Sequence, residues 1–352
     1  MPASSIVARF AVRPFAAKLK RPFITSLGRK DTSVNVGMTV TLRSGARGYG
    51  EASSSLALAH LTPGSLARTM TLLGRSALGC DAAGARGMVA AAWKRHASSP
   101  PAVSAFEAAL LGALLADQGM TMDAWLGGAL TRAESDVTLS AWDPGTTAEA
   151  AAEAAADGFR LLKIKVGPDH RENLARTRAA LSAMPKPSRR LILDGNQGLT
   201  ARSALALVEA CMKEGAVVEL LEQPLPKTDE AGMRELTRRS PAPVAADEMV
   251  LSPEDAVRVA DRGLASAINI KLAKSGVFRA LEIAATARAA GLGLMIGCMA
   301  ESAEGLTPSV GLALGTGYFR WVDLDSDYLH EDAQPPALWR RNGPWLESRG
   351  KA

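Results

Sequence analysis

The pattern of hydrophobic and polar positions predicts an array of alternating strands and helices over the C-terminal two thirds of the chain. Short apolar runs bounded by glycine or proline recur there, and alanine-rich stretches with helical spacing separate them. The predicted strands are Val137–Trp142, Phe159–Val166, Arg190–Asn196, Val217–Gln223, Val244–Met249, Ala267–Ala273, Leu292–Met299 and Phe319–Asp325. Their largely apolar interiors favour an α/β fold with a closed parallel barrel over an open doubly wound sheet.

The residues before this array predict a separate α+β domain. The strand-like runs are Ile6–Val12 and Asn35–Leu42, and the stretches with helical spacing are Leu66–Leu73, Met88–Trp93 and Val103–Ala116. The glycine pair at 127 and 128 marks the end of this domain. We therefore predict an α+β domain over residues 1–128, a barrel over 129–326 and a C-terminal segment over 327–352.

Composition and charge exclude several classes of protein. The chain has 352 residues with a formal net charge of +5, and its basic pairs are scattered without interleaved aromatic residues, so we expect no nucleic-acid partner. No run approaches the roughly 18 uninterrupted apolar residues of a membrane span. Cys80, Cys211 and Cys298 lie far apart, which argues against a disulfide scaffold and a thiolate zinc site. We therefore expect a cytoplasmic protein.

Ionisable residues stand at the ends of successive predicted strands. Lys163 and Lys165 alternate with an apolar residue, so both side chains point to the same face of their strand. Asp194, Glu222 and Asp247 end the next three strands. The C-terminal ends of barrel strands meet at one mouth, where barrel active sites form. Three carboxylates without a thiolate or an imidazole are a ligand set suited to Mg²⁺.

A second lysine position predicts the type of reaction. Lys271 ends the sixth strand, across the barrel from Lys165. Removing a proton next to a carboxylate requires a neutral base and strong stabilisation of the negative charge that develops. Lys163 and a metal ion can lower the pKa of Lys165 enough for it to act as that base. A lysine on each side of the substrate predicts racemisation or epimerisation.

These motifs resemble those of the enolase superfamily, in its muconate-lactonising subgroup. The matching segments, in family order, are Lys163–Gly167, Asp194–Gly198, Glu222–Pro224, Ala246–Glu248 and Asn269–Lys271, with Gly48–Ala52 resembling a turn of the family's capping domain. The resemblance implies a modified TIM barrel, (β/α)7β, with an N-terminal α+β capping domain on which residues 327–352 pack back. It also implies Mg²⁺ bound by the three strand-end carboxylates, and a homo-oligomer by analogy.

Within this subgroup, the resemblance assigns Lys165 and Lys271 to acid/base catalysis and Lys163 to the substrate carboxylate. Asp323 and Asp325 share one face of the last strand, an acidic pair suited to a substrate cation. The similar position in dipeptide epimerases holds the dipeptide ammonium, so we predict a Mg²⁺-dependent epimerase that inverts the C-terminal residue of a dipeptide. The alternatives are an o-succinylbenzoate synthase or N-acylamino acid racemase, and a noncatalytic barrel that binds small ligands.

Substrate contacts are expected from the capping loop and from the first and seventh strands. The loop around Arg21 to Arg29 should close over the site through Ser26, Gly28 and Arg29. Relatives acting on Ala-Glu carry an arginine in this loop where Gly28 stands here, which favours a small or hydrophobic C-terminal residue. The remaining predicted contacts are Thr138, Met299, Ala300 and Glu301, of which Glu301 either reads a cationic side chain or is a solvated acid at the rim.

Overall fold

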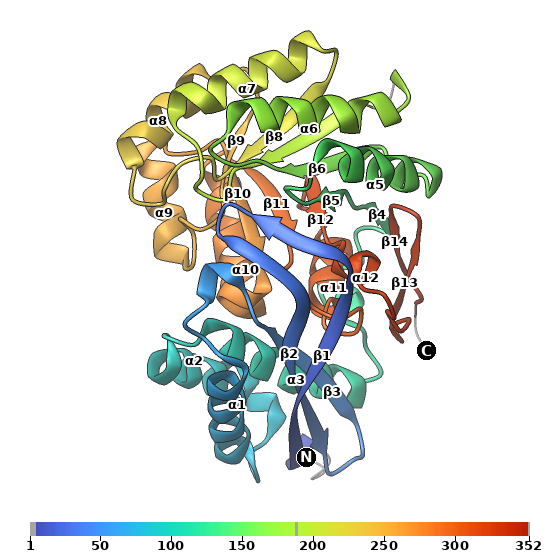
Figure 1. Ribbon diagram of the computed structural model, residues 1–352. Helices are drawn as coiled ribbons and strands as arrows, with labels where there is room; N and C mark the ends of the chain where they lie inside the picture. The colour runs from blue at the N-terminus through green and yellow to red at the C-terminus, as the bar shows by residue number, and fades with distance from the viewer. Residues whose placement is uncertain (1–4, 187–188, 351–352) are drawn as a thin grey trace.

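The computed structural model describes residues 5–186 and 189–350, and its centre is a barrel of parallel strands in sequence order (Figure 1). The strands are β5 (Val137–Leu139), β6 (Leu161–Lys165), β7 (Arg190–Asp194), β8 (Val217–Glu222), β9 (Val244–Ala246), β10 (Ala267–Lys271), β11 (Gly293–Gly297) and β12 (Trp321–Asp323). The backbone N–H of Asp136 donates to the carbonyl of Val322 at 2.9 Å, which joins the first strand to the last. All eight predicted strands are confirmed, although several are shorter than predicted.

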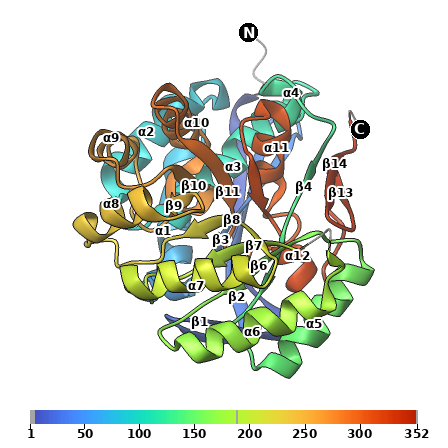
Figure 2. The same cartoon turned by 90° about the horizontal axis from the view of Figure 1, so that it is seen from above.

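Seven helices connect these strands and surround them (Figure 2). They are α5 (Pro144–Ala156), α6 (His170–Ala183), α7 (Ala201–Lys213), α8 (Glu230–Arg239), α9 (Pro253–Arg262), α10 (Leu272–Ala289) and α11 (Thr307–Thr316). Capping side chains begin several of them, as at α7, where Thr200 and Ser203 form a reciprocal pair of capping hydrogen bonds. The (β/α)7β architecture expected from the sequence is confirmed.

The barrel interior has an apolar floor beneath a polar layer. The floor consists of one buried residue from each of β6 to β12, namely Leu161, Ile192, Leu220, Ala245, Ala267, Met295 and Trp321. Side chains alternate along a strand, so the next inward position lies two residues later. Those positions hold Lys163, Asp194, Glu222, Asp247, Asn269, Gly297 and Asp323. Strand alternation therefore places the candidate residues together, above a packed base.

The N-terminal domain is an antiparallel sheet covered by helices (Figure 1). Its elements are β1 (Val7–Thr25), β2 (Gly28–Leu42), β3 (Arg47–Ser53), α1 (Pro63–Ala77), α2 (Ala85–His96), α3 (Pro100–Asp117) and α4 (Met122–Trp125), with short 3₁₀ turns at Leu56–Leu58 and Ala82–Gly84. Gly48 and Gly50 of β3 face α3 so closely that an added Cβ would collide with the helix backbone. The Gly-Tyr-Gly segment is therefore part of a strand and not a turn, and its glycines allow the sheet to pack on α3.

The first two strands are much longer than the predicted Ile6–Val12 and Asn35–Leu42. They extend as a two-stranded ribbon as far as the hairpin turn between Thr25 and Gly28. Most β1 side chains are exposed or half-buried. Beyond the predicted runs, Leu19 and Ser33 are the only residues of these two strands that are buried, so few positions carry the apolar signal of a buried strand and the prediction stopped too early.

The C-terminal segment forms a small sheet with a strand next to the barrel. β13 (Trp339–Asn342) pairs with β14 (Trp345–Ser348), which pairs with β4 (Arg132–Glu134). Near α12 (Ser326–Leu329), His330 of this segment bridges to Leu19 of β1. The hairpin itself packs elsewhere, because Trp339 and Leu346 belong to the barrel core. The outer ends, residues 1–4 and 351–352, lie outside the described residues.

Helix α3 lies between the two domains. Among the described helices it alone is long and apolar enough to cross a membrane, but 72% of its apolar stretch is buried inside the protein, where it packs on β3 and α10. Glu107 of α3 accepts a hydrogen bond from the backbone N–H of Phe278 at 2.7 Å. This hydrogen bond lies where the helical geometry of α10 is interrupted at Gly276. Position 276 requires glycine, because its φ is +68° and because an added Cβ would collide with the Glu107 carboxylate. Glu107 therefore links the N-terminal domain to a barrel helix.

The buried position of Glu107 makes stability depend on pH. Burial raises its pKa from 4.5 to about 7, so the folded protein keeps a proton that the unfolded chain has lost. Stability should therefore fall as the pH rises from about 4.5 to about 7, by up to about 3 kcal/mol. In urea unfolding at pH 5 and pH 8, Glu107→Gln should gain stability relative to the wild type at the higher pH. If the difference in the free energy of unfolding between Glu107→Gln and the wild type is the same at both pH values, this assignment is contradicted.

Candidate active site

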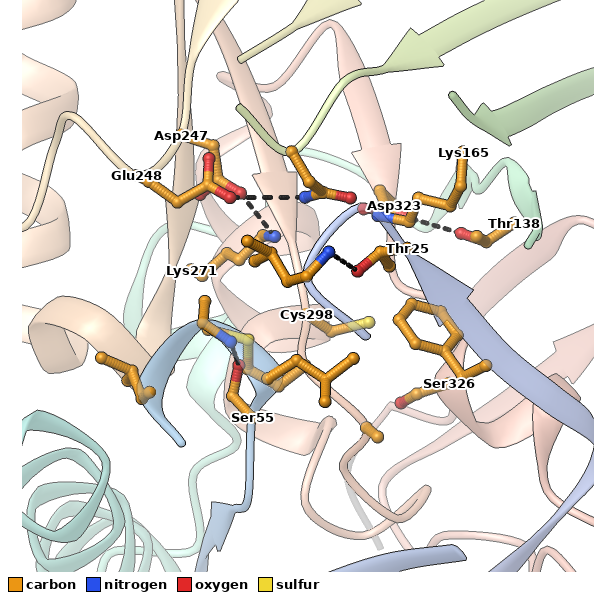
Figure 3. Close-up of a pocket in the computed structure, with 18 of the residues that line it drawn as sticks. Thr25, Ser55, Thr138, Lys165, Asp247, Glu248, Lys271, Cys298, Asp323 and Ser326 are labelled. Carbon is orange, nitrogen blue, oxygen red and sulfur yellow. Dashed lines mark hydrogen bonds and ion pairs between the residues drawn. The ribbon is translucent and has the colours of Figure 1, made fainter. Parts of the chain in front are cut away.

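A cavity lies at the C-terminal ends of the barrel strands, beneath the tip of the β1–β2 hairpin (Figure 3). The charged and polar barrel residues in its wall include Thr138, Lys163, Lys165, Asn196, Gln197, Lys227, Asp247, Glu248, Lys271, Lys274, Asp323, Asp325 and Ser326. Asp194 and Glu222 are fully buried and contact lysines of this wall. The structure thus brings the lysines, the strand-end carboxylates and the acidic pair into one site.

Lys163 is the central cation of the site. It is 1% exposed, and its Nζ lies 3.0 Å from Asp194, 2.7 Å from Glu222 and 2.7 Å from Asp323. Burial lowers the pKa of Lys163, but the charges of its carboxylate partners outweigh burial and hold that pKa well above its usual value. Lys163 is therefore a fixed positive charge in the middle of the barrel.

Lys165 and Lys271 occupy opposite sides of the cavity (Figure 3). Lys165 donates to Asp194 at 2.6 Å, and Lys271 donates to Asp247 at 2.8 Å. Burial lowers the pKa of Lys271, but Asp247 and Glu222 raise it above the usual range. Each lysine is thus held by one of the predicted metal ligands, and a cation bound to these carboxylates would release the lysine from that partner.

The strand-end carboxylates fit a divalent cation. Burial and the charge of Asp194 raise the pKa of Glu222 to about 7, and burial and the charge of Asp247 raise that of Glu248 to about 8. One Glu248 oxygen is buried without a hydrogen-bond donor among the described residues. The raised pKa values show that these neighbouring carboxyl groups disfavour one another's negative charge, and their oxygen atoms are the ligands that Mg²⁺ prefers. The predicted set of Asp194, Glu222 and Asp247 could therefore hold Mg²⁺.

A second carboxylate cluster lies around β12. One oxygen each of Asp136, Asp323 and Asp325 lies within 4.8 Å of the others, and all three residues are buried. Thr138 donates its backbone N–H to Asp325 at 2.6 Å and its hydroxyl to Asp323 at 3.4 Å. Asp323 and Asp325 line the cavity, so this cluster presents negative charge to a ligand beside Lys163.

The hairpin tip covers the cavity, but through residues other than those predicted. Arg29 is exposed and pairs with Asp31 at 2.8 Å, and Ser26 donates to the carbonyl of Asn196 at 2.8 Å. Ser26, Gly28 and Arg29 are absent from the cavity wall, which Thr25, Leu27 and Lys30 line instead. Strand alternation explains the difference, because Arg29 and Asp31 share the face opposite to Lys30.

The loop after β11 is fixed by the N-terminal domain. The Ala300 carbonyl accepts hydrogen bonds from Asn35 at 2.7 Å and from Ser33 at 3.1 Å. Glu51 accepts from the same Asn35 at 2.7 Å and from the Ser302 backbone N–H at 2.9 Å. A buried polar network in the sheet therefore positions the Ala300 wall of the cavity.

Met299 and Ala300 line the cavity as predicted, but Glu301 does not. Its side chain is 7% exposed, so the interpretation as a solvated rim acid is wrong. Burial and the charge of Glu51 raise the pKa of Glu301 to about 7. The N-terminal sheet covers this loop and removes Glu301 from solvent, which the sequence of the loop alone does not reveal.

Several site residues were not predicted from the sequence. Lys274 donates to Asp247 at 2.6 Å, and Asn269 donates to Glu222 at 2.6 Å. Gln223 accepts from the Asp247 backbone N–H at 2.9 Å and fixes the loop after β8. Asn269 alternates with Lys271 on one strand and could have been found by that spacing. Lys274 lies on the following helix, where the sequence carries no comparable signal.

The cavity wall facing the N-terminal domain is mainly apolar. Its apolar side chains include Phe23, Leu27, Leu56, Leu58, Leu251 and Met299. Lys30 also lines this wall, where it donates to the carbonyl and, at 2.9 Å, to the hydroxyl of Ser54. Burial lowers the pKa of Lys30 to about 8, so Lys30 is still largely an ammonium at pH 7. Apart from Lys30, the wall is suited to an apolar group.

Comparison with known proteins agrees with this geometry. Residues 146–344 match the family described as Enolase C-terminal domain-like. An aromatic dipeptide epimerase of Herpetosiphon aurantiacus is 38% identical over 88% of this chain and 86% of its own. A hydrophobic dipeptide epimerase of Citrifermentans bemidjiense is 35% identical over 95% and 91%.

A solved structure is similar to this protein over nearly the whole length of both chains. The dipeptide epimerase of Enterococcus faecalis, complexed with Mg and the dipeptide L-Leu-L-Tyr, is 29% identical with a TM-score of 0.92. The match covers 99% of this chain and 98% of the Enterococcus chain. Fold, site and sequence therefore agree: the chain belongs to the enolase superfamily, in its muconate-lactonising subgroup, and is an isomerase of the racemase and epimerase class.

Proposed function

We propose that this protein is a Mg²⁺-dependent epimerase of hydrophobic dipeptides, which inverts the α-carbon of the C-terminal residue. The observation that carries the proposal is the pair of lysines, Lys165 and Lys271, on opposite sides of a cavity that also exposes Asp323 and Asp325. Opposed bases suit the loss of a proton from one face and its return to the other. The acidic pair suits a substrate with a free ammonium.

The lysines exchange the α-proton. In its neutral form, one lysine accepts the proton from the α-carbon, and the opposite lysine, as an ammonium, donates a proton to the other face. The roles reverse for the opposite epimer, so both epimers are substrates. Asp194 and Asp247 hold the two Nζ atoms at the cavity wall through hydrogen bonds at 2.6 and 2.8 Å, which a cation bound to these carboxylates would release.

Three charged residues orient the dipeptide. Lys163 places a fixed positive charge where the substrate carboxylate gains negative charge during proton removal. Asp323 and Asp325 hold the α-ammonium at the other end. Bound by the strand-end carboxylates, Mg²⁺ supplies positive charge that stabilises the developing negative charge on the substrate carboxylate.

The apolar wall supports a preference for hydrophobic residues. Leu27, Leu56 and Met299 line the cavity, and Arg29 points away from it. Lys30 already donates to the carbonyl and the hydroxyl of Ser54, which leaves it fewer free donors for an acidic side chain. The aromatic and hydrophobic dipeptide epimerases among the relatives support the same preference.

Magnesium should stabilise the folded protein. Millimolar Mg²⁺ should raise the melting temperature by several degrees, because binding at about 100 times Kd adds about 2.7 kcal/mol. Glu222→Gln should abolish most of this increase. Glu219→Gln is a matched control, because Glu219 lies on the same strand and pairs with Arg190 away from the cavity. An equal response of both variants would refute the metal site.

The substrate preference can be measured by deuterium uptake. With Mg²⁺ in D₂O, the protein should introduce one deuteron at the C-terminal residue of L,L-dipeptides. Its kcat/KM should be at least about tenfold higher for L-Leu-L-Tyr than for L-Ala-L-Glu. Burial of an apolar side chain against the apolar wall contributes about 1–3 kcal/mol to the binding free energy. If kcat/KM is highest for L-Ala-L-Glu, the proposed preference for hydrophobic dipeptides is wrong. Uptake by N-acylamino acids with none by dipeptides would favour the racemase alternative.

A further inference from the structure

Asp136 is a carboxylate in an otherwise apolar layer of the barrel. It precedes β5 and lies two residues before Thr138, which pairs in register with Lys163. The same spacing separates Lys163 from Leu161 of the apolar floor. Asp136 therefore occupies the floor position of the first strand, where its side chain is fully buried. A buried carboxyl group among apolar side chains is costly and requires a compensating interaction.

The hydrogen bonds in the cluster are unevenly distributed. Asp323 accepts from Lys163 at 2.7 Å and from the Thr138 hydroxyl at 3.4 Å, and Asp325 accepts from the Thr138 backbone N–H at 2.6 Å. Both Asp136 oxygens lack a donor among the described residues. Donors thus stabilise negative charge on Asp323 and Asp325 but not on Asp136.

Protonation of Asp136 would remove the negative charge that no donor stabilises. Three ionised carboxylates within 4.8 Å repel one another strongly in a dry interior. Burial and the charges of Asp323 and Asp325 raise the pKa of Asp136 well above its usual value. The protonated acid becomes a donor, and Asp323 lies beside it as an acceptor. Lys163 is the cation that faces the cluster from β6.

We propose that Asp136 is a positioning residue of the ammonium site, a protonated acid that donates a hydrogen bond to Asp323 from the barrel floor. This inference rests on the proposed function, in which Asp323 and Asp325 hold the substrate ammonium. Asp136 lies outside the cavity wall and does not touch the substrate. Its hydrogen bond fixes the orientation of the Asp323 carboxylate. Because Asp136 carries the proton, Asp323 and Asp325 stay negatively charged where they face the ligand.

Kinetics of two variants test this role. Asp136→Asn keeps a neutral donor of similar shape, whereas Asp136→Ala removes the donor. With a dipeptide as substrate, Asp136→Ala should raise KM at least tenfold with kcat changed less than threefold, and Asp136→Asn should restore KM to within threefold of the wild type. Glu107→Gln, which replaces another buried acid between the domains, should leave KM unchanged. An unchanged KM in Asp136→Ala, or a tenfold rise in Asp136→Asn, would overturn the proposal.

Infrared spectroscopy tests whether Asp136 is protonated, and it needs no substrate. The spectrum of the wild type minus that of Asp136→Asn should contain the C=O stretch of a protonated carboxylic acid. Absence of that band would overturn the proposal, even if Asp136→Ala does not fold. If the wild type turns over no dipeptide while the band is present, the proposed function has failed and the protonated Asp136 stands.

Discussion

The charges inside the barrel must neutralise one another, and the arrangement of the site depends on this constraint. Lys163 is almost completely buried, and three carboxylates surround it at 2.7 to 3.0 Å. Buried ions are tolerated when they are paired and hydrogen-bonded. Strand alternation supplies these partners from β7, β8 and β12, while the apolar floor below supports them. The same network brings the oxygen atoms of Asp194, Glu222 and Asp247 together, where a divalent cation would fit, and it leaves negative charge at Asp323 and Asp325, which suits a substrate cation.

The N-terminal domain completes the cavity that the barrel begins. Its long hairpin brings Leu27 and Lys30 over the strand ends, and its network of Asn35 and Glu51 holds the loop that contains Ala300. The cavity wall therefore includes residues remote in sequence from the lysines, and under the proposed function these residues would contact the substrate side chain. The barrel provides the chemistry, and the fit between the two domains shapes the space for the side chain.

The sequence predicts the charged layer well, because each member ends a strand whose apolar run is easily found. It fails where neighbouring segments decide the environment. The ribbon of β1 and β2 is scarcely buried beyond the predicted runs, so its length was underestimated, and Arg29 was placed at the site although strand alternation turns it away. Glu301 and Asp136 depend on burial by other elements. Assembly into a homo-oligomer and a cytoplasmic location stay predictions.

The central claim is that two opposed lysines exchange one proton, and isotope exchange by single-lysine variants tests it most directly. Lys165→Arg and Lys271→Arg would each be incubated with the two epimers of a substrate dipeptide in D₂O. The account predicts that neither variant epimerises, and that each still exchanges the α-proton of one epimer, a different epimer for each variant. Exchange of the same epimer by both variants, or continued epimerisation by either, would contradict it.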